Sequence, residues 1–92
     1  MLPSQILKVA LEKFKLNGEK WKKGKIYGGE YCILTAIHSI AKSKFMIVGR
    51  LFKEANNIND SIIQWNDAPE RTWTEIKEAF EKAIKLAKES EK

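Results

Sequence analysis

The sequence has little cysteine and no long apolar run, and each shortage excludes a class of protein. Cys32 is the one cysteine among 92 residues, so the chain cannot form an internal disulfide. Small extracellular domains usually depend on several disulfides, so we expect a protein of the reducing cytoplasm. The first residues lack the charged and apolar regions of a signal peptide, and no segment approaches the ~20 apolar residues that cross a bilayer. We expect no membrane partner.

Histidine is equally scarce, and this argues against catalysis. His38 is the only imidazole, and no second histidine or cysteine lies at a metal-ligand spacing, so we expect no metal and no cofactor. On one helix, Cys32 and His38 would lie about 240° apart around the axis and ~9 Å apart along it, too far for a catalytic pair. We expect Cys32 to be a packing residue and the chain not to be an enzyme. A cysteine-dependent enzyme is the least favoured alternative.

The composition is that of a folded globular chain, with 43% hydrophobic and 32% charged residues. The formal net charge of +5 is unevenly placed. Residues 1–55 carry 11 Lys and Arg against four acids, whereas residues 56–92 carry six against eight. Such asymmetry fits an anionic partner, although it is common in lysine-rich proteins that bind none.

Apolar residues recur at helical spacing in successive segments. They predict helices over residues 4–16, 30–41, about 45–56, a short stretch capped by Asn59 or Asp60, and a final helix from Trp73. Residues 66–69 read as a turn. We expect residues 1–92 to form a single all-α domain, a compact bundle of four to five helices, with a loop arm at 19–29 and a frayed C-terminal tail at 88–92.

The start of the final helix is the most clearly marked in the chain. Thr72-Trp73-Thr74-Glu75 matches a capping box, in which the side chains of the first and fourth residues each satisfy a free backbone N–H. We expect this helix to pack on the helix at residues 31–41. Trp65 and Trp73, which flank the preceding turn, should both face the core.

The densest basic segment is a candidate binding site formed by Lys20, Trp21, Lys22, Lys23 and Lys25. An aromatic residue among lysines suits a phosphate backbone with an unstacked base. That function would require these lysines to share a face with Lys42, Lys44, Arg50 or Lys53. Two other interpretations stay open: a contact for an acidic protein, and a solvated loop whose Trp21 packs inward.

Asp67 and Arg71 are a second candidate, because together they could form a fork for a polar ligand. In the alternative interpretation Asp67 caps its own turn and Arg71 pairs with it.

Two segments carry a family resemblance. Residues 29–37 read Gly-Glu-Tyr-Cys-Ile-Leu-Thr-Ala-Ile, and residues 63–72 read Ile-Gln-Trp-Asn-Asp-Ala-Pro-Glu-Arg-Thr before an amphipathic helix. The chain resembles an uncharacterised family of small bacterial and phage proteins, a domain of unknown function, in which a Tyr-Cys segment opens a helix and a Trp-Asn-Asp turn precedes the last one. Thr35 departs from the usual Gly. The resemblance implies a helical fold and a bacterial or mobile-element origin, and no activity.

These observations favour a non-catalytic binding or regulatory protein, a phage or mobile-element accessory factor that acts by protein–protein interaction. The partner is an unknown macromolecule, and a protein is favoured over nucleic acid. A homo-oligomer is compatible with the sequence. The alternative is a nucleic-acid-binding module that uses the basic segment Lys20 to Lys25.

Overall fold

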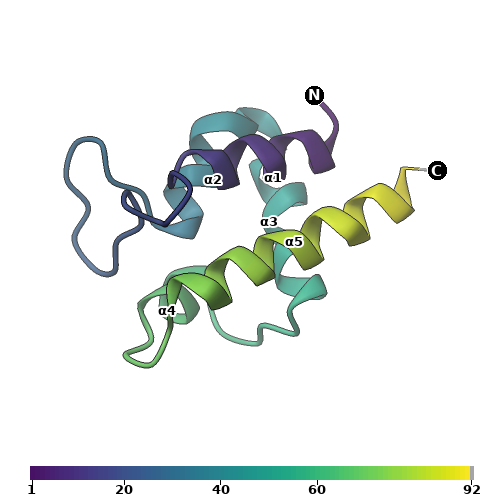
Figure 1. Ribbon diagram of the computed structural model, residues 1–92. Helices are drawn as coiled ribbons and strands as arrows, with labels where there is room; N and C mark the ends of the chain where they lie inside the picture. The colour runs from purple at the N-terminus through teal and green to yellow at the C-terminus, as the bar shows by residue number, and fades with distance from the viewer. Residues whose placement is uncertain (92) are drawn as a thin grey trace.

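The computed structural model describes residues 1–91, and these residues form five α-helices and one short 3-10 helix (Figure 1). In chain order the elements are α1 (Pro3–Glu12), α2 (Ile33–Ala41), η1 (Lys42–Lys44), α3 (Phe45–Ala55), α4 (Ile62–Asp67) and α5 (Trp73–Ser90). Within residues 1–91 no strand forms, apart from an isolated bridge between Trp21 and Tyr31. The prediction of an all-α bundle of four to five helices is confirmed.

The longest helix, α5, begins where the sequence predicts. The Thr72 hydroxyl accepts the Glu75 N–H at 3.3 Å, and the Glu75 carboxylate accepts the Thr72 N–H at 3.1 Å. These are the two bonds of a capping box, so that prediction is confirmed. The buried face of α5 includes Ile76, Phe80 and Ala83.

This face packs against α1 and α3, which Figure 1 shows beside α5. The prediction that the last helix packs on residues 31–41 is therefore wrong. Because α1 and α3 fill the apolar side of α5, α2 packs instead against α1, α3 and α4.

Three phenylalanine rings form the centre of the core. Phe14, Phe52 and Phe80 are fully buried. The ring centroid of Phe80 lies 5.6 Å from that of Phe14 and 5.0 Å from that of Phe52, both in edge-to-face geometry. Each such pair contributes about 0.5–1.5 kcal/mol beyond the area it buries. Phe80 of α5 thus joins the segment after α1 to α3.

Trp65 and Trp73 pack on the margin of this core, each half-buried. The Trp73 ring lies 5.6 Å from Phe14, and the Trp65 ring lies 6.2 Å from Phe52. The prediction that both tryptophans face the core is confirmed.

The first two helices are shorter than predicted. Helix α1 ends at Glu12 and not at Leu16, because the chain turns sharply at Lys15, whose φ is 70°. Helix α2 begins at Ile33 and not near Glu30. Tyr31 is held in extended backbone pairing, donating its N–H to Lys20 and accepting that of Lys22, so a helix cannot start before it.

Helix α4 begins and ends later than predicted. Its N-cap is Ser61, whose hydroxyl accepts the Gln64 N–H at 3.1 Å, and not Asn59 or Asp60. The helix then continues through residues 66–67, which the sequence placed in a turn.

The predicted fraying of residues 88–92 is wrong for the residues described. Helix α5 continues to Ser90, and Ala87 within its last turn is fully buried. The Glu91 carboxylate accepts hydrogen bonds from the Ser4 N–H at 3.0 Å and from the Ser4 hydroxyl at 2.7 Å. The Ser4 N–H has no partner within α1, because it lies in the first turn of the helix. Its hydrogen bond to Glu91 therefore ties the end of α5 to the start of α1. Lys92 lies outside the described residues.

The start of α1 and the end of α5 consequently lie at the same end of the bundle (Figure 1). Across residues 1–91, every helix is too short or too polar to cross a membrane.

The turn after α1 offers a test of this packing. Gly18 has a φ of 72°, and a methyl group on it would overlap the Trp73 indole ring. We expect Gly18→Ala to lower the free energy of unfolding by about 2–4 kcal/mol, from left-handed strain together with overpacking. Gly24 is the control, because its φ is 70° and nothing lies within 4 Å of an added methyl. Gly24→Ala should cost only about 1 kcal/mol in urea unfolding. Equal costs would contradict the Trp73 contact.

Candidate functional site

The buried side chain of Asn66 fixes the base of the arm (residues 19–29). Its Oδ1 accepts the indole N–H of Trp21 at 2.9 Å and the backbone N–H of Ile33 at 3.1 Å. Its Nδ2 donates to the Lys22 carbonyl at 3.1 Å and to the Asp67 carboxylate at 2.9 Å. All four hydrogen bonds of a primary amide are formed, so a fully buried polar side chain carries no unpaired atom.

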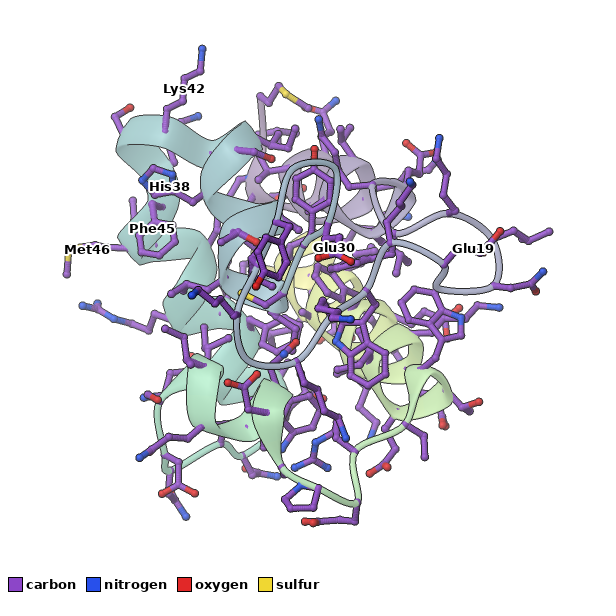
Figure 2. The ribbon with its side chains drawn as sticks, turned by 90° about the vertical axis from the view of Figure 1, so that its left-hand side faces the viewer. Glu19, Glu30, His38, Lys42, Phe45 and Met46 are labelled. Carbon is purple, nitrogen blue, oxygen red and sulfur yellow. The ribbon has the colours of Figure 1, made fainter. Side chains whose placement is uncertain are left out.

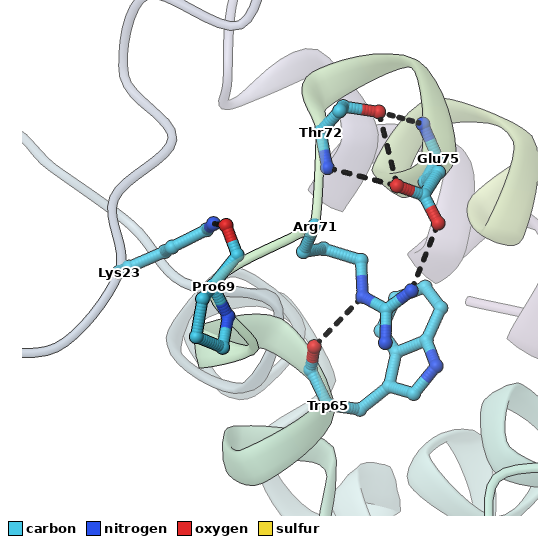
Figure 3. Close-up of polar contacts among 6 residues, drawn as sticks. All are labelled: Lys23, Trp65, Pro69, Arg71, Thr72 and Glu75. Atoms are coloured by element: carbon cyan, nitrogen blue, oxygen red, sulfur yellow. Dashed lines mark hydrogen bonds and ion pairs between the residues drawn. The ribbon is translucent and has the colours of Figure 1, made fainter.

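Two further contacts attach the arm to the segment around α4. The ammonium of Lys23 donates to the Pro69 carbonyl at 3.0 Å (Figure 3). The Gly24 N–H donates to the Asp67 carboxylate at 3.0 Å. The first half of the arm is therefore bound to the bundle over several successive residues.

Trp21 is part of this attachment. Its ring is half-buried and lies 6.4 Å from the Trp73 ring, while its N–H points to Asn66. This is the inward packing that one of the three interpretations required. The Trp21 indole therefore packs against the bundle and is not available to stack on a nucleic-acid base. The base-stacking contact suggested by the sequence would need another aromatic residue.

The lysines of the arm are differently placed. Lys20, Lys22 and Lys25 are exposed, and Lys23 is half-buried beside Pro69. Lys22 lies 4.0 Å from the Glu30 carboxylate. Figure 2 shows Glu30 in the middle of the face that carries the arm, with Lys42 projecting at its edge. Acidic groups therefore interrupt the basic surface.

The fork predicted from Asp67 and Arg71 does not form. The Asp67 carboxylate accepts from Asn66 and Gly24, whereas Arg71 Nη1 donates to Glu75 at 2.9 Å. Within residues 1–91 no bond joins Asp67 to Arg71, so the alternative, in which the two pair with each other, is also wrong. Both side chains are held by hydrogen bonds to other parts of the fold.

Arg71 lies over Trp65 (Figure 3). Its guanidinium carbon is 3.7 Å from the ring centroid, and its Nε donates to the Trp65 carbonyl at 2.9 Å. A guanidinium stacked on an indole adds cation–π attraction to its hydrogen bonds. This geometry joins Arg71 to Trp65 of α4 and to Glu75 of α5.

Glu75 receives both the cap and the guanidinium. The hydrogen bond from the Thr72 backbone N–H lowers the pKa of Glu75 below its ordinary value, and Arg71 contributes in the same direction. Partial loss of hydration raises the pKa of Glu75, but the hydrogen bonds and Arg71 together outweigh this effect.

Cys32 and His38 occupy separate environments. Cys32 is 6% exposed and is the N-cap of α2, where its sulfur accepts the Thr35 N–H at 3.5 Å. His38 is exposed and lies edge-on to Phe45, with ring centroids 5.0 Å apart (Figure 2). Among residues 1–91, no group of three or more His, Cys, Asp or Glu could hold a metal ion.

A broad concavity lies elsewhere, on α3, α4 and the segment between them. It is an open groove of about 650 Å³. Its apolar lining includes Leu34, Phe45, Met46, Ile58, Ile62 and Ile63. Met46 is 74% exposed and Ile63 is 46% exposed, whereas Ile58 and Ile62 are buried at its base. We call this the α3–α4 groove.

Sequence analysis missed the groove, although a signal was present. Residues 45–48 read Phe-Met-Ile-Val, and one face of a helix cannot bury four consecutive apolar side chains. The helical spacing that puts Phe45 and Val48 on the buried side of the helix leaves no place there for Met46 and Ile47. The structure exposes both of them.

The match to a known family covers nearly all of this structure. Residues 3–86 match the model described as Family of unknown function (DUF6197). The chain belongs to this family. The match confirms the resemblance to an uncharacterised family, and it includes the arm, the Asn66 cluster and the α3–α4 groove. No curated protein and no solved structure matches the chain.

Replacement of the Asn66 side chain should strongly destabilise the fold. We expect Asn66→Ala to lower the free energy of unfolding by about 3 kcal/mol or more, because it leaves the Trp21 indole N–H and the Ile33 N–H buried without acceptors. Urea unfolding followed by tryptophan fluorescence would measure this. Asn59→Ala is the matched control at an exposed position and should change stability by less than about 0.5 kcal/mol. A cost below about 1 kcal/mol for Asn66→Ala would contradict the anchoring role.

The lowered pKa of Glu75 predicts a pH dependence. A carboxylate whose pKa is lower in the folded chain stabilises it above the ordinary value of 4.5, and this stabilisation is lost as the pH falls through the folded pKa. We expect Glu75→Gln, which keeps a capping side chain, to reduce the loss of stability on acidification below pH 4.5. Urea midpoints across the acid range would show the difference. Identical pH profiles would contradict it.

Proposed function

We propose that this chain is a non-catalytic binding protein that acts through protein–protein contact. In this proposal the α3–α4 groove receives the apolar side of an amphipathic α-helix from another polypeptide chain. The observation that carries the proposal is the groove itself, an open apolar concavity in a chain of 92 residues. Exposed apolar surface that is contiguous and rimmed by polar residues typically marks an interaction site.

The chemistry of the lining supports a helix as the occupant. Met46 of α3 and Ile63 of α4 line it as exposed side chains, and Ile58 and Ile62 line it as buried ones. An amphipathic helix fills such a groove with side chains spaced three and four residues apart. The unbranched thioether of Met46 can adapt its shape to different apolar partners.

The rim has the polarity expected of an interface. Arg50, Lys53 and Glu54 border the apolar floor along α3. Interfaces combine an apolar centre with a polar, solvent-accessible rim. The groove thus supplies both components within one surface.

The surroundings of the cysteine support a role without catalysis. Cys32 is buried and its sulfur contacts Thr35, while the only imidazole lies against Phe45. The motif resemblance supports a bacterial or phage accessory factor, and the single cysteine supports a cytoplasmic location.

A nucleic-acid-binding arm is the second candidate, and the exposure of Lys20, Lys22 and Lys25 favours it. Phosphate attraction by lysine needs no particular register and gives salt-dependent binding. The inward position of Trp21 removes the stacking part of that hypothesis. The groove therefore supports protein binding better than the arm supports nucleic-acid binding.

A designed amphipathic peptide tests the proposed function. We would titrate a labelled helical peptide of about 15 residues, with leucines along one face and mixed Glu and Lys on the other, and follow its fluorescence anisotropy. Met46→Glu should weaken binding at least about tenfold, because it places a charge on the apolar wall. Leu16→Glu is the control, since Leu16 is 83% exposed and lies outside the groove.

Backbone amide NMR shifts in the same titration locate the contact. We expect changes at Leu34, Met46 and Ile63. No peptide binding, or equal weakening by both variants, would overturn the groove as the binding surface.

A further inference from the structure

Another concavity lies between the end of α1 and the arm, and it shares no lining residue with the α3–α4 groove. It is a hollow of about 390 Å³, a size typical of sites for small molecules. Lys13, Lys15 and Lys20 line it, from the C-cap of α1, the turn that follows and the arm. Of the residues 1–91 that line it, only Glu12 is acidic, so the formal net charge of the lining is +2. We call this the basic hollow.

The three lysines of the basic hollow are not neutralised by any carboxylate of residues 1–91. In that part of the chain, Lys22 is the one lysine within 4.0 Å of a carboxylate. The lysine ammonium groups that donate hydrogen bonds there belong to Lys23 and Lys44. Three positive charges thus line one hollow without a counter-charge in contact, although like charges repel. A ligand that carries negative charge would relieve this repulsion.

Lysines near a helix C-terminus often serve the helix itself, by bonding its last carbonyl groups or by opposing its dipole. At the end of α1 the backbone already bonds these groups. The carbonyls of Ala10, Leu11 and Glu12 each accept a backbone N–H. The Phe14 carbonyl accepts the N–H of Lys20. The dipole effect is confined to the last turn, so it does not account for a lysine that the arm brings to the same hollow.

Lys15 adopts a strained backbone conformation beside the hollow. Its φ is 70°, in the left-handed region that favours glycine. The other left-handed positions nearby, Gly18 and Gly29, are glycines. The Lys15 side chain is exposed, so packing does not explain why a lysine stands at this position. Backbone strain of this kind occurs at ligand sites, where the side chain itself is needed.

The wall of the hollow on the arm side is fixed by the backbone. Tyr31 donates its N–H to the Lys20 carbonyl at 2.8 Å, which holds these two lining residues together. The Lys13 ammonium lies 5.7 Å from the centroid of the Tyr31 ring. Gly29 also lines the hollow, and its N–H donates to no atom of residues 1–91. A preformed wall with an unused donor lowers the cost of binding a ligand.

We propose that the basic hollow binds the phosphate group of a small phosphorylated molecule. A phosphomonoester carries a charge of about −1.5 to −2 at neutral pH, which matches the +2 of the lining. Lysine binds phosphate as a point charge, without the fixed geometry of a guanidinium. Val9 and the Tyr31 ring supply apolar surface for the group that carries the phosphate. The phosphates of a nucleic-acid backbone carry one charge each and follow one another along a strand, so a single hollow suits them less.

A titration of the full chain with methyl phosphate tests the site. We would follow backbone amide NMR shifts at constant ionic strength. We expect saturable shifts at Lys20, Gly29 and Tyr31, with a dissociation constant of about 10 mM or lower, as for a small and weakly bound ligand. Dimethyl phosphate, a diester with less negative charge, should bind at least about threefold more weakly.

Matched variants locate the binding. Lys20→Gln should raise the dissociation constant about threefold to fivefold, as expected for the loss of one exposed charge pair. Lys25→Gln is the control, an exposed lysine of the same arm outside the hollow, and should change it less than about twofold. Glu12→Gln should lower it at least about twofold, because it removes the carboxylate of the lining. Lys15→Gly should weaken binding as Lys20→Gln does but keep or raise the urea midpoint, since glycine adopts this φ without strain.

Several results would overturn the site, and none of them bears on peptide binding in the α3–α4 groove. Methyl phosphate without saturable shifts is one. Equal weakening by Lys20→Gln and Lys25→Gln is another, because attraction would then follow the overall charge. Equal binding of both esters would exclude a monoester site. A short peptide with one phosphoserine distinguishes the source: binding at least about tenfold tighter than methyl phosphate would assign the hollow to phosphorylated protein and overturn the small molecule. Equal or weaker binding would support it.

Discussion

The four hydrogen bonds of Asn66 hold together parts of the chain that helix packing alone would leave separate. They connect α4 to the arm through Trp21 and Lys22, and to the first residue of α2 through the Ile33 N–H. Because the amide is fully buried, each of these bonds forms in a region of low dielectric, where losing a partner is costly. The direction in which the arm leaves the bundle therefore depends on this side chain together with the contacts of Lys23 and Gly24.

This constraint has a consequence for the surface. The contacts of the Asn66 cluster draw Trp21, Asp67 and Arg71 into structural roles, and together they use the end of α4. The start of α4 is not used in this way, and Ile63 is left exposed in the groove that Met46 of α3 also lines. The groove thus lies on apolar surface that the contacts of the Asn66 cluster do not cover. The proposed binding surface and the stabilising contacts of Asn66 thus use opposite ends of the same short helix.

The sequence predicted the elements that depend on local patterns. The capping box at Thr72 and the apolar spacing along residues 73–87 located the last helix, because both act within one or two turns. Contacts between distant segments could not be predicted in this way. From its neighbours in the sequence, Asn66 is predicted to be a turn residue. Its hydrogen-bond partners Trp21 and Ile33 lie 45 and 33 positions away, so no local pattern indicates them. The groove depends likewise on where α3 and α4 meet, although the run of apolar residues at 45–48 showed that part of α3 had to be exposed.

The contact between Ser4 and Glu91 joins residues 87 positions apart. Helices α1 and α5, the first and last helices within residues 1–91, pack directly against each other. Closing so long a loop is entropically unfavourable until the packing it permits is formed, and contacts of this range slow folding. During synthesis on the ribosome, the apolar face of α1 would stay exposed to solvent until α5 had left the ribosome and could pack against it. The core should therefore be completed only after α5 has been synthesised, and Ile6 and Leu7, which are buried in the folded chain, would be exposed to other nascent chains until then.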